Sequence, residues 1–136
     1  AFSEAGCSSI TIPMGITYIG YGAFCECHSL TALVLPDSVE YIDAYAFSRC
    51  SALSSVKFGK GITYIGSNAF DYCGKLKEIV LGDAVEIIES SAFSYCNALT
   101  TVTLGKQVKR IGGGAVGKMQ IVSVKFLHAF QQDTDA

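Results

Sequence analysis

The sequence lacks the long apolar runs, the charge excess and the leader segment that characterise several large classes of proteins. Although 50% of its 136 residues are apolar, no run reaches the roughly 18 residues expected of a membrane-spanning helix. No basic segment followed by an apolar stretch opens the chain, so we expect no signal peptide within it. The 10 basic and 12 acidic residues give a net charge of -2, which argues against a nucleic-acid-binding surface.

The sequence also lacks the motifs of common catalytic sites. It contains no nucleophile elbow, no phosphate-binding loop and no zinc-protease helix. The carboxylates of Asp37, Glu40, Asp83 and Glu86 are expected at outward positions of an open surface. Nothing there would desolvate a pair of carboxyl groups enough to make one an acid and the other a base. We therefore expect no enzymatic activity and no cofactor.

What the sequence does contain is a repeat of 23 residues. The pattern Ala-Phe, two residues, then Cys occurs four times without an insertion, and Leu follows each Cys by three residues. The copies are Ala23-Phe24 to Cys27, Ala46-Phe47 to Cys50, Ala69-Phe70 to Cys73 and Ala92-Phe93 to Cys96. A fixed period of this length indicates one small structural unit that stacks on copies of itself, so that equivalent residues form columns.

Each repeat predicts two extended segments and a turn. The pattern Leu30-x-x-Leu33-x-Leu35 ends in an alternation typical of a short strand. A second extended segment follows, with Val39 and Ile42 pointing inward. The spacings of four and seven over residues 46–53 predict a short helical turn. We therefore expect an α/β solenoid, a right-handed superhelix of short parallel strands and short helical turns.

The period also predicts the domain organisation. We expect a single domain over residues 1–136 with about five repeats, in which residues 1–9 form a partial N-terminal repeat. Residues 124–136 would supply the last strand and a C-terminal tail. Terminal repeats that depart from the pattern are expected where an open core is capped.

The stretch from Ile65-Gly66 through Ala69-Phe70 and Cys73 to Leu76 resembles the BspA-like leucine-rich repeat, and the likeness covers about residues 1–126. The resemblance implies a curved leucine-rich repeat solenoid with parallel strands on its concave side. It also implies a secreted or cell-surface protein, a fragment of a longer array, with a protein ligand. Several members of the family are linked to adhesion and bind host matrix proteins such as fibronectin and fibrinogen. Because the motif consists of core positions, it assigns no ligand-binding residue here.

The six cysteines suggest a disulfide framework or a metal site, but their positions favour neither. Four of them form one column, Cys27, Cys50, Cys73 and Cys96, whose side chains would run parallel rather than face one another. We therefore expect buried free thiols. Cys25 lies in a column with Ser48, Asp71 and Ser94 that we expect to face solvent, so Cys25, Cys27 and His28 should not converge on a metal.

The outward columns predict where a partner could bind. Tyr18, Tyr41 and Tyr64 share one column of the second extended segment, and Lys57 and Glu78 lie on outward columns of the first strand. The three phenols either pack on one another or form a contact surface. The resulting hypothesis is a non-catalytic module that binds a host or matrix protein at these five residues. The alternative is a structural spacer or self-assembly segment with no ligand of its own.

Overall fold

The computed structural model describes residue 6, residues 8–115 and the backbone of residues 123–126. Most of the predicted partial repeat 1–9 and of the predicted tail 124–136 therefore lies outside the described residues. Eleven short strands occur within them. They are β1 (Ser9–Thr11), β2 (Tyr18–Ile19), β3 (Ala32–Val34), β4 (Tyr41–Ile42), β5 (Ser55–Lys57), β6 (Tyr64–Ile65), β7 (Glu78–Val80), β8 (Ile87–Ile88), β9 (Thr101–Leu104), β10 (Arg110–Ile111) and β11 (Ser123–Phe126).

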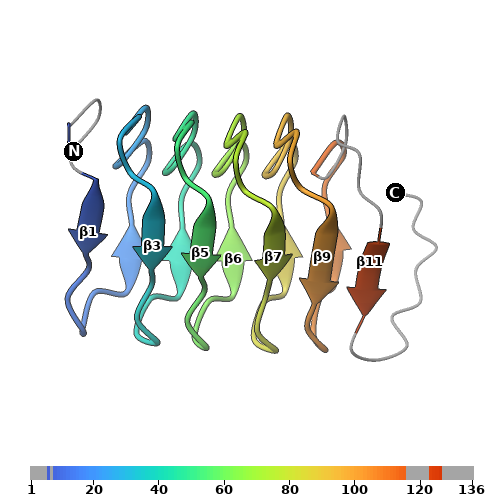
Figure 1. Ribbon diagram of the computed structural model, residues 1–136. Helices are drawn as coiled ribbons and strands as arrows, with labels where there is room; N and C mark the ends of the chain where they lie inside the picture. Colours follow the sequence, from blue (N-terminus) through green and yellow to red (C-terminus); the bar gives the residue numbers. More distant parts are fainter. Residues whose placement is uncertain (1–5, 7, 116–122, 127–136) are drawn as a thin grey trace.

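The strands alternate between two sides of a solenoid (Figure 1). Each 23-residue coil contains one odd-numbered front strand and one even-numbered back strand. Coils 1 to 4 comprise residues 8–30, 31–53, 54–76 and 77–99, and coil 5 begins at residue 100. The back sheet has the order β10-β8-β6-β4-β2, while the front strands form two sheets, β1-β3-β5 and β11-β9-β7. Every pairing is parallel, so the predicted parallel strands are confirmed.

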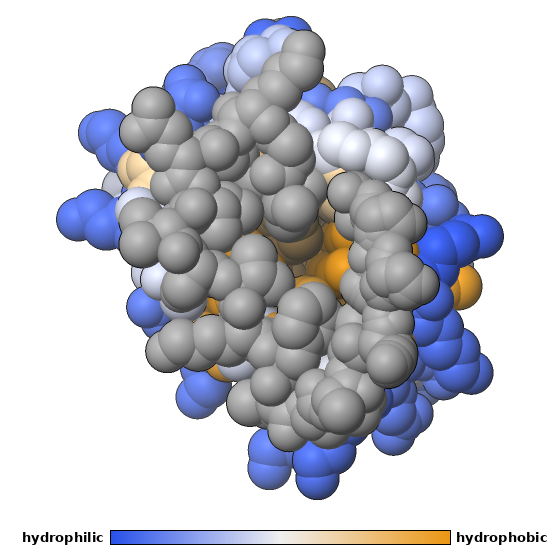
Figure 2. Space-filling model, turned by 90° about the vertical axis from the view of Figure 1, so that its right-hand side faces the viewer, coloured by the Kyte–Doolittle hydropathy of each residue, from blue (hydrophilic) through white to orange (hydrophobic). Residues whose placement is uncertain are grey.

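The core lies between the front and back strands and is built from the predicted columns. In each strand the residues alternate, so that Leu33 and Ile42 are buried while their neighbours face outward. A row of four phenylalanine rings, Phe24, Phe47, Phe70 and Phe93, runs along the core with centroids 5.2, 5.1 and 5.5 Å apart. Seen along the solenoid axis, apolar side chains lie at the centre and hydrophilic ones at the rim (Figure 2). This apolar column is the main source of stability, because each buried side chain contributes about 1.5–3 kcal/mol.

The predicted helical turns are wrong, and with them the α part of the α/β fold: the described residues contain no helix. The segment that follows each back strand is a series of tight turns instead. Tyr45 and Arg49 have φ angles of 60° and 63°, and Asn68 and Tyr72 repeat them one coil later at 60° and 59°. A right-handed helix requires φ near −63°. Two residues in the left-handed region, four positions apart, therefore exclude a helical turn in each coil. The fold is a β-solenoid.

The hydrogen bonds of this segment explain why the helix does not form. In an α-helix each N–H would donate to the carbonyl four residues earlier. Here the N–H of Phe47 donates to the carbonyl of Ala69 (2.7 Å), and that of Arg49 donates to the carbonyl of Asp71 (2.8 Å). The N–H groups between these donate within the turn, to carbonyls three residues earlier, so bonds to the next coil and bonds within the turn alternate and no series of bonds four residues apart forms. Spacings of four and seven arise from stacked turns as readily as from a helix, so the pattern alone could not separate the two.

Candidate binding surface

The three tyrosines of the predicted site form a continuous stack on the back sheet. Tyr18 pairs with Tyr41 and Tyr41 with Tyr64 in the strand register. The ring centroids are 5.3 and 4.3 Å apart, with interplanar angles of 25° and 6°. Tyr18 is 53% exposed, and the other two side chains are half-buried. We call these three residues the Tyr row.

Two hydroxyls of the Tyr row are held by carboxylates of the following coil. Tyr18 donates to Oδ2 of Asp43. Tyr64 donates to Oε2 of Glu89 over 2.9 Å, and Arg110 Nη2 donates to the same oxygen over 2.7 Å. The hydrogen bond to Asp43 raises the pKa of Tyr18. Burial, followed by the bond to Glu89, raises the pKa of Tyr64. Both phenols therefore stay neutral and fixed in position at physiological pH.

The geometry determines what the Tyr row can offer to a partner. Because the rings stack along the solenoid axis, they cover one another's faces and present their edges and hydroxyls outward. Among the described residues, no ring covers the N-terminal face of Tyr18. The row is thus both internally packed, which is one of the two predicted alternatives, and open to solvent along one side. A strip of this kind suits edge contacts and hydrogen bonds better than face-to-face stacking.

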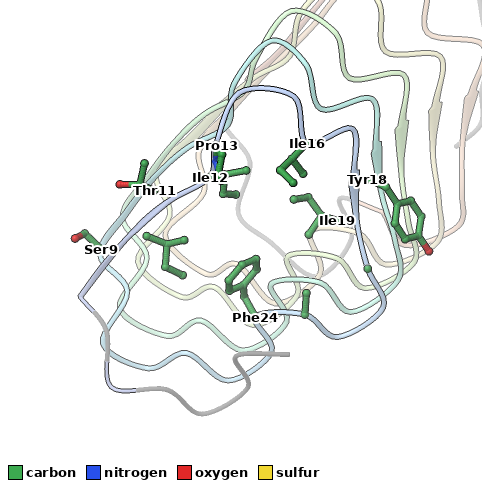
Figure 3. Close-up of a pocket in the computed structure, with 11 residues that line it drawn as sticks. Ser9, Thr11, Ile12, Pro13, Ile16, Tyr18, Ile19 and Phe24 are labelled. Atoms are coloured by element: carbon green, nitrogen blue, oxygen red, sulfur yellow. The ribbon is translucent and has the colours of Figure 1, made fainter.

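Lys57 and Glu78 lie elsewhere on the molecule. Both are exposed, Lys57 on β5 and Glu78 on β7, and therefore belong to the front strands. The first coil shows the relationship: Ser9 and Thr11 of the front strand point away on one side and Tyr18 of the back strand on the other (Figure 3). The structure therefore brings the three tyrosines together but does not bring Lys57 or Glu78 to them.

The column of Cys25, Ser48, Asp71 and Ser94 is not the solvent-facing column that we predicted. Ser48, Asp71 and Ser94 are 2%, 5% and 6% exposed, and Cys25 is half-buried. Ser48 donates from Oγ to Oδ1 of Asp71, and Asn68 donates from Nδ2 to Oδ2 over 2.7 Å. The outcome is a satisfied polar ladder beside the core. Sequence reasoning missed it because small polar residues look alike at the surface and in a hydrogen-bonded turn.

A second aromatic cluster lies on the turns. Tyr72 and Tyr95 stack with centroids 4.6 Å apart, and the guanidinium carbon of Arg49 lies 4.4 Å from the centre of the Tyr72 ring. A cation over a ring face at this distance is favourable by about 0.5–1 kcal/mol at exposed sites.

The cysteine column is buried, as predicted. Cys27, Cys50, Cys73 and Cys96 have no exposed surface, and all five cysteines of the described residues are free thiols. No three His, Cys, Asp or Glu side chains in the described part of the chain are arranged to hold a metal ion. In particular, Cys27 points into the core while His28 is exposed and lies 3.1 Å from Oγ of Ser51.

A family model for the BspA type leucine rich repeat region matches residues 1–122 in six copies. The chain belongs to this family. The predicted resemblance is thereby confirmed, and the solenoid, the buried motif positions and the family agree. A search of curated proteins finds no significant match. Across the described residues, no helix is long and apolar enough to cross a membrane.

Three solved structures share the fold of this BspA-type chain. A leucine-rich cell surface protein from Faecalibacterium prausnitzii is 28% identical with a TM-score of 0.84, over 90% of this chain and 32% of that one. The leucine-rich repeat protein of T. pallidum is 33% identical with a TM-score of 0.78, over 87% and 55%. A leucine-rich repeat protein from Bacteroides ovatus, at 20% identity and a TM-score of 0.67, supports the fold alone. The chain spans between a third and about half of the length of these relatives.

Proposed function

We propose that the chain is a non-catalytic, protein-binding module of a cell-surface or secreted protein, and that its partner binds along the Tyr row. The observation that carries the proposal is the stack of three phenols on the back sheet, held in place by the carboxylates of Asp43 and Glu89. Tyrosine is among the residues that contribute most to protein interfaces. The description of the Faecalibacterium relative as a cell surface protein supports the location.

The fixed geometry of the row favours a protein partner. Side chains that are already ordered lose little conformational entropy when a partner binds, so more of the contact energy appears as affinity. Adjacent coils lie about 4.8 Å apart, so the row spans about 10 Å, the length of three residues of an extended segment. Such a segment could contact the exposed ring edges and accept or donate hydrogen bonds at the hydroxyls. The family resemblance supports adhesion to a host or matrix protein as the role of this contact.

Lys57 and Glu78 enter the proposal in a different way. Because they lie on the front strands, a partner bound to the Tyr row would touch them only if it wrapped around the coil. They are therefore the natural control positions. Substitutions there change exposed charges without altering the back sheet.

The test is binding of the purified chain to immobilised fibronectin and to immobilised fibrinogen by surface plasmon resonance. We expect binding to at least one of them, and a loss of about 100-fold or more for the double variant Tyr41→Ser/Tyr64→Ser, as for interface hot spots. Tyr41→Phe/Tyr64→Phe should lose less, since the ring edges remain. Lys57→Ala/Glu78→Ala should bind like the wild type. Circular dichroism would confirm that each variant is folded.

Two results would overturn the proposal. If neither matrix protein binds, the adhesion role is wrong. If binding survives in the folded Tyr41→Ser/Tyr64→Ser variant but fails in Lys57→Ala/Glu78→Ala, the partner uses the front strands and the Tyr row is packing alone.

A second candidate function, a spacer segment within a longer array, is favoured by the N-terminal end of the solenoid. A cavity of about 520 Å³ opens there, lined by Ile10, Ile12, Ile16, Ile19 and Phe24 among others (Figure 3). Its apolar lining is what another coil would cover.

Backbone N–H groups at the N-terminal end also favour another coil as the segment that would cover the cavity. Within the solenoid, the N–H of Glu40 donates to the carbonyl of Thr17 (2.8 Å) and that of Asp43 to the carbonyl of Ile19 (2.9 Å). The equivalent donors of coil 1, the N–H groups of Thr17 and Gly20, have no acceptor among the described residues. A copy of residues 31–53 fused before residue 8 should therefore raise the unfolding temperature. A copy carrying Val39→Ser and Ile42→Ser should not. Equal unfolding temperatures for the two fusions would exclude the spacer function.

A further inference from the structure

The front strands are interrupted at one junction only within the described solenoid. β1, β3 and β5 pair in register, and so do β7, β9 and β11, but β5 and β7 do not pair. The break therefore falls between coil 3 and coil 4. The front strands pair in register at every other described junction, which makes this junction a departure that needs a local cause.

One cause is the residue that precedes the front strand. At the other junctions this residue is Thr31, Ser54 or Thr100, and both its N–H and its hydroxyl donate to the carbonyl one coil earlier. Coil 4 has Lys77 in this position, which has no hydroxyl. Its N–H donates to no group of the described residues, although the carbonyl of Ser54 occupies the equivalent place. Both hydrogen bonds are thus missing where the strands fail to pair.

A second cause lies at the turn after the front strand. Asp37 accepts a hydrogen bond from the N–H of Lys60 (2.9 Å), and Asp83 accepts one from the N–H of Lys106 (3.3 Å). Coil 3 has Lys60 in the position of these aspartates. An ammonium group cannot accept a hydrogen bond, so the N–H of Asp83 has no equivalent acceptor in coil 3. Met14 holds this position in coil 1, where the front strands still pair, so the missing aspartate weakens the junction but does not break it by itself.

The core residue at the end of the strand also differs. Leu35, Leu81 and Leu104 are buried in their column, whereas coil 3 has Phe58, which is only partly buried. Its ring meets Phe70 edge-on with centroids 5.5 Å apart. A ring larger than Leu at this position leaves less room for the next coil to close on the strand.

The space around the glycines of the front turns gives an independent measure of the distance between neighbouring coils. A Cβ placed on Gly59 would lie 2.5 Å from the carbonyl oxygen of Pro36, and one on Gly105 would lie 2.2 Å from that of Gly82. These distances show close contact at the neighbouring junctions. A Cβ on Gly82 would lie 3.8 Å from the carbonyl oxygen of Gly59, which is ordinary contact. The two coils are therefore farther apart at this turn than their neighbours are.

The opposite side of the same junction is intact. β6 and β8 pair in register in the back sheet. In the turns, the N–H of Phe70 donates to the carbonyl of Ala92 (2.8 Å), and that of Tyr72 donates to the carbonyl of Ser94 (2.9 Å). Coils 3 and 4 are thus hydrogen-bonded along the back sheet and the turns, but their front strands are not paired.

We propose that the junction between coils 3 and 4 is a hinge, at which the front of the solenoid opens while the back sheet holds. Opening separates Lys57 of β5 from Glu78 of β7. The stacking of the Tyr row is kept, because its three strands β2, β4 and β6 all belong to coils 1 to 3 and the back sheet holds. The hinge divides the array into two blocks that move relative to each other about β6 and β8. Local opening of this kind follows from a shortage of buried contacts and hydrogen bonds at one junction.

Amide hydrogen exchange read residue by residue by NMR tests the hinge. The N–H groups of Lys77 and Phe58 should exchange at least about tenfold faster than their equivalents Ser54 and Leu35 in the preceding junction. In the back sheet, Glu89 and Gly66 should exchange at similar rates. Equal protection of Lys77 and Ser54 would overturn the proposal.

Restoring the repeat pattern provides the matched variant. Phe58→Leu, Lys60→Asp and Lys77→Thr together give coil 3 and coil 4 the kinds of residue found at the two flanking junctions. We expect this variant to slow exchange at position 77 to the rate seen at Ser54 and to leave β3 unchanged. If the variant is folded and position 77 still exchanges fast, the break does not arise from these side chains and the proposal fails.

Proximity across the junction distinguishes an opening hinge from a static gap. Pyrene labels at Lys57→Cys and Val80→Cys span the hinge, and labels at Val34→Cys and Lys57→Cys span the closed junction before it. A Cys7→Ser/Cys25→Ser background removes the two cysteines outside the buried column, and Ser at position 25 matches Ser48 and Ser94. In urea below the unfolding transition, excimer emission should fall for the first pair and hold for the second. A parallel loss in both pairs would contradict the hinge.

Discussion

The thiol of Cys96 lies 3.1 Å from the carbonyl oxygen of Phe70 and donates to it from the next coil. The same contact joins Cys50 to Phe24 (3.2 Å) and Cys73 to Phe47 (3.4 Å). The cysteine column therefore ties consecutive coils together beside the stacked phenylalanine rings. A thiol suits this place because it is small, apolar and still able to satisfy a buried carbonyl.

The first prediction concerns the reactivity of these thiols. A thiol reagent such as DTNB should modify the four buried cysteines, Cys27, Cys50, Cys73 and Cys96, only after denaturation, since they have no exposed surface. Cys25 should react first but slowly, because it is half-buried and burial raises its pKa. Rapid modification of any of these four thiols in the native protein would contradict this arrangement.

The second prediction concerns stability at alkaline pH. Burial raises the pKa of Cys50 to about 12, compared with about 8.5 in an unfolded chain. The folded state therefore holds a proton that the unfolded state loses, and the linkage slope is negative in this range. The stabilisation is complete below about pH 8.5 and declines as the pH rises toward 12.

Unfolding temperatures measured from pH 7 to 11 would check the effect. The wild type should lose stability faster above pH 9 than Cys50→Ala, which cannot titrate at this position. Taking the difference between the two proteins removes the contribution of the tyrosines, whose raised pKa values act in the same direction. Parallel curves would show that the pKa of the Cys50 thiol is the same in the folded and unfolded states, which would contradict the prediction.

The third prediction concerns the phenylalanine stack. Phe70→Ala should cost about 3–5 kcal/mol in the free energy of unfolding, through lost transfer energy and the cavity left behind. Phe70 is fully buried, whereas Phe24 is 8% exposed. Phe24→Ala should therefore cost less. Urea unfolding gives both values, and equal losses would argue against stability that depends on neighbouring coils.

The sequence predicted the columns of the fold well because burial repeats with the period. Leu33 and Ile79 are buried, and strands form at the expected segments, since an inward column must be apolar in every coil. The turns were harder. Of the two columns with positive φ, the first includes Gly22, Asn68 and Gly114, which was a signal of the left-handed region that the helical spacing obscured. The second column contains no glycine or asparagine: its residues are Glu26, Arg49, Tyr72 and Tyr95.

The partners of the Tyr row could not be predicted for a related reason. Asp43 and Glu89 share a column with Gly66, so the column has no constant chemistry and looks like an ordinary outward position. The hinge could not be predicted from the sequence either. Phe58, Lys60 and Lys77 each fit the apolar or polar character of their columns. Lys60 and Lys77 cannot form the side-chain hydrogen bonds of the flanking junctions, and Phe58 is larger than leucine. These differences become apparent only when the coils are compared in three dimensions.

The fourth prediction compares two glycines on either side of the hinge. Gly105→Ala should destabilise the protein by about 1–3 kcal/mol, because its Cβ would lie 2.2 Å from the carbonyl oxygen of Gly82 and the backbone would have to shift. Gly82→Ala should be neutral or raise stability by up to about 1 kcal/mol, since the space beside it is open and Ala restricts the unfolded chain. Neither glycine has a positive φ, so the substitution itself adds no backbone strain.

Thermal and urea unfolding of the two variants measure this difference. The comparison is matched, because both glycines follow the front strand of their coil and differ in the coil that precedes them. In the background of Phe58→Leu, Lys60→Asp and Lys77→Thr, coil 4 should close onto coil 3, and Gly82→Ala should then become as costly as Gly105→Ala. If Gly82→Ala is already costly in the wild type, the front of the junction is closed in solution.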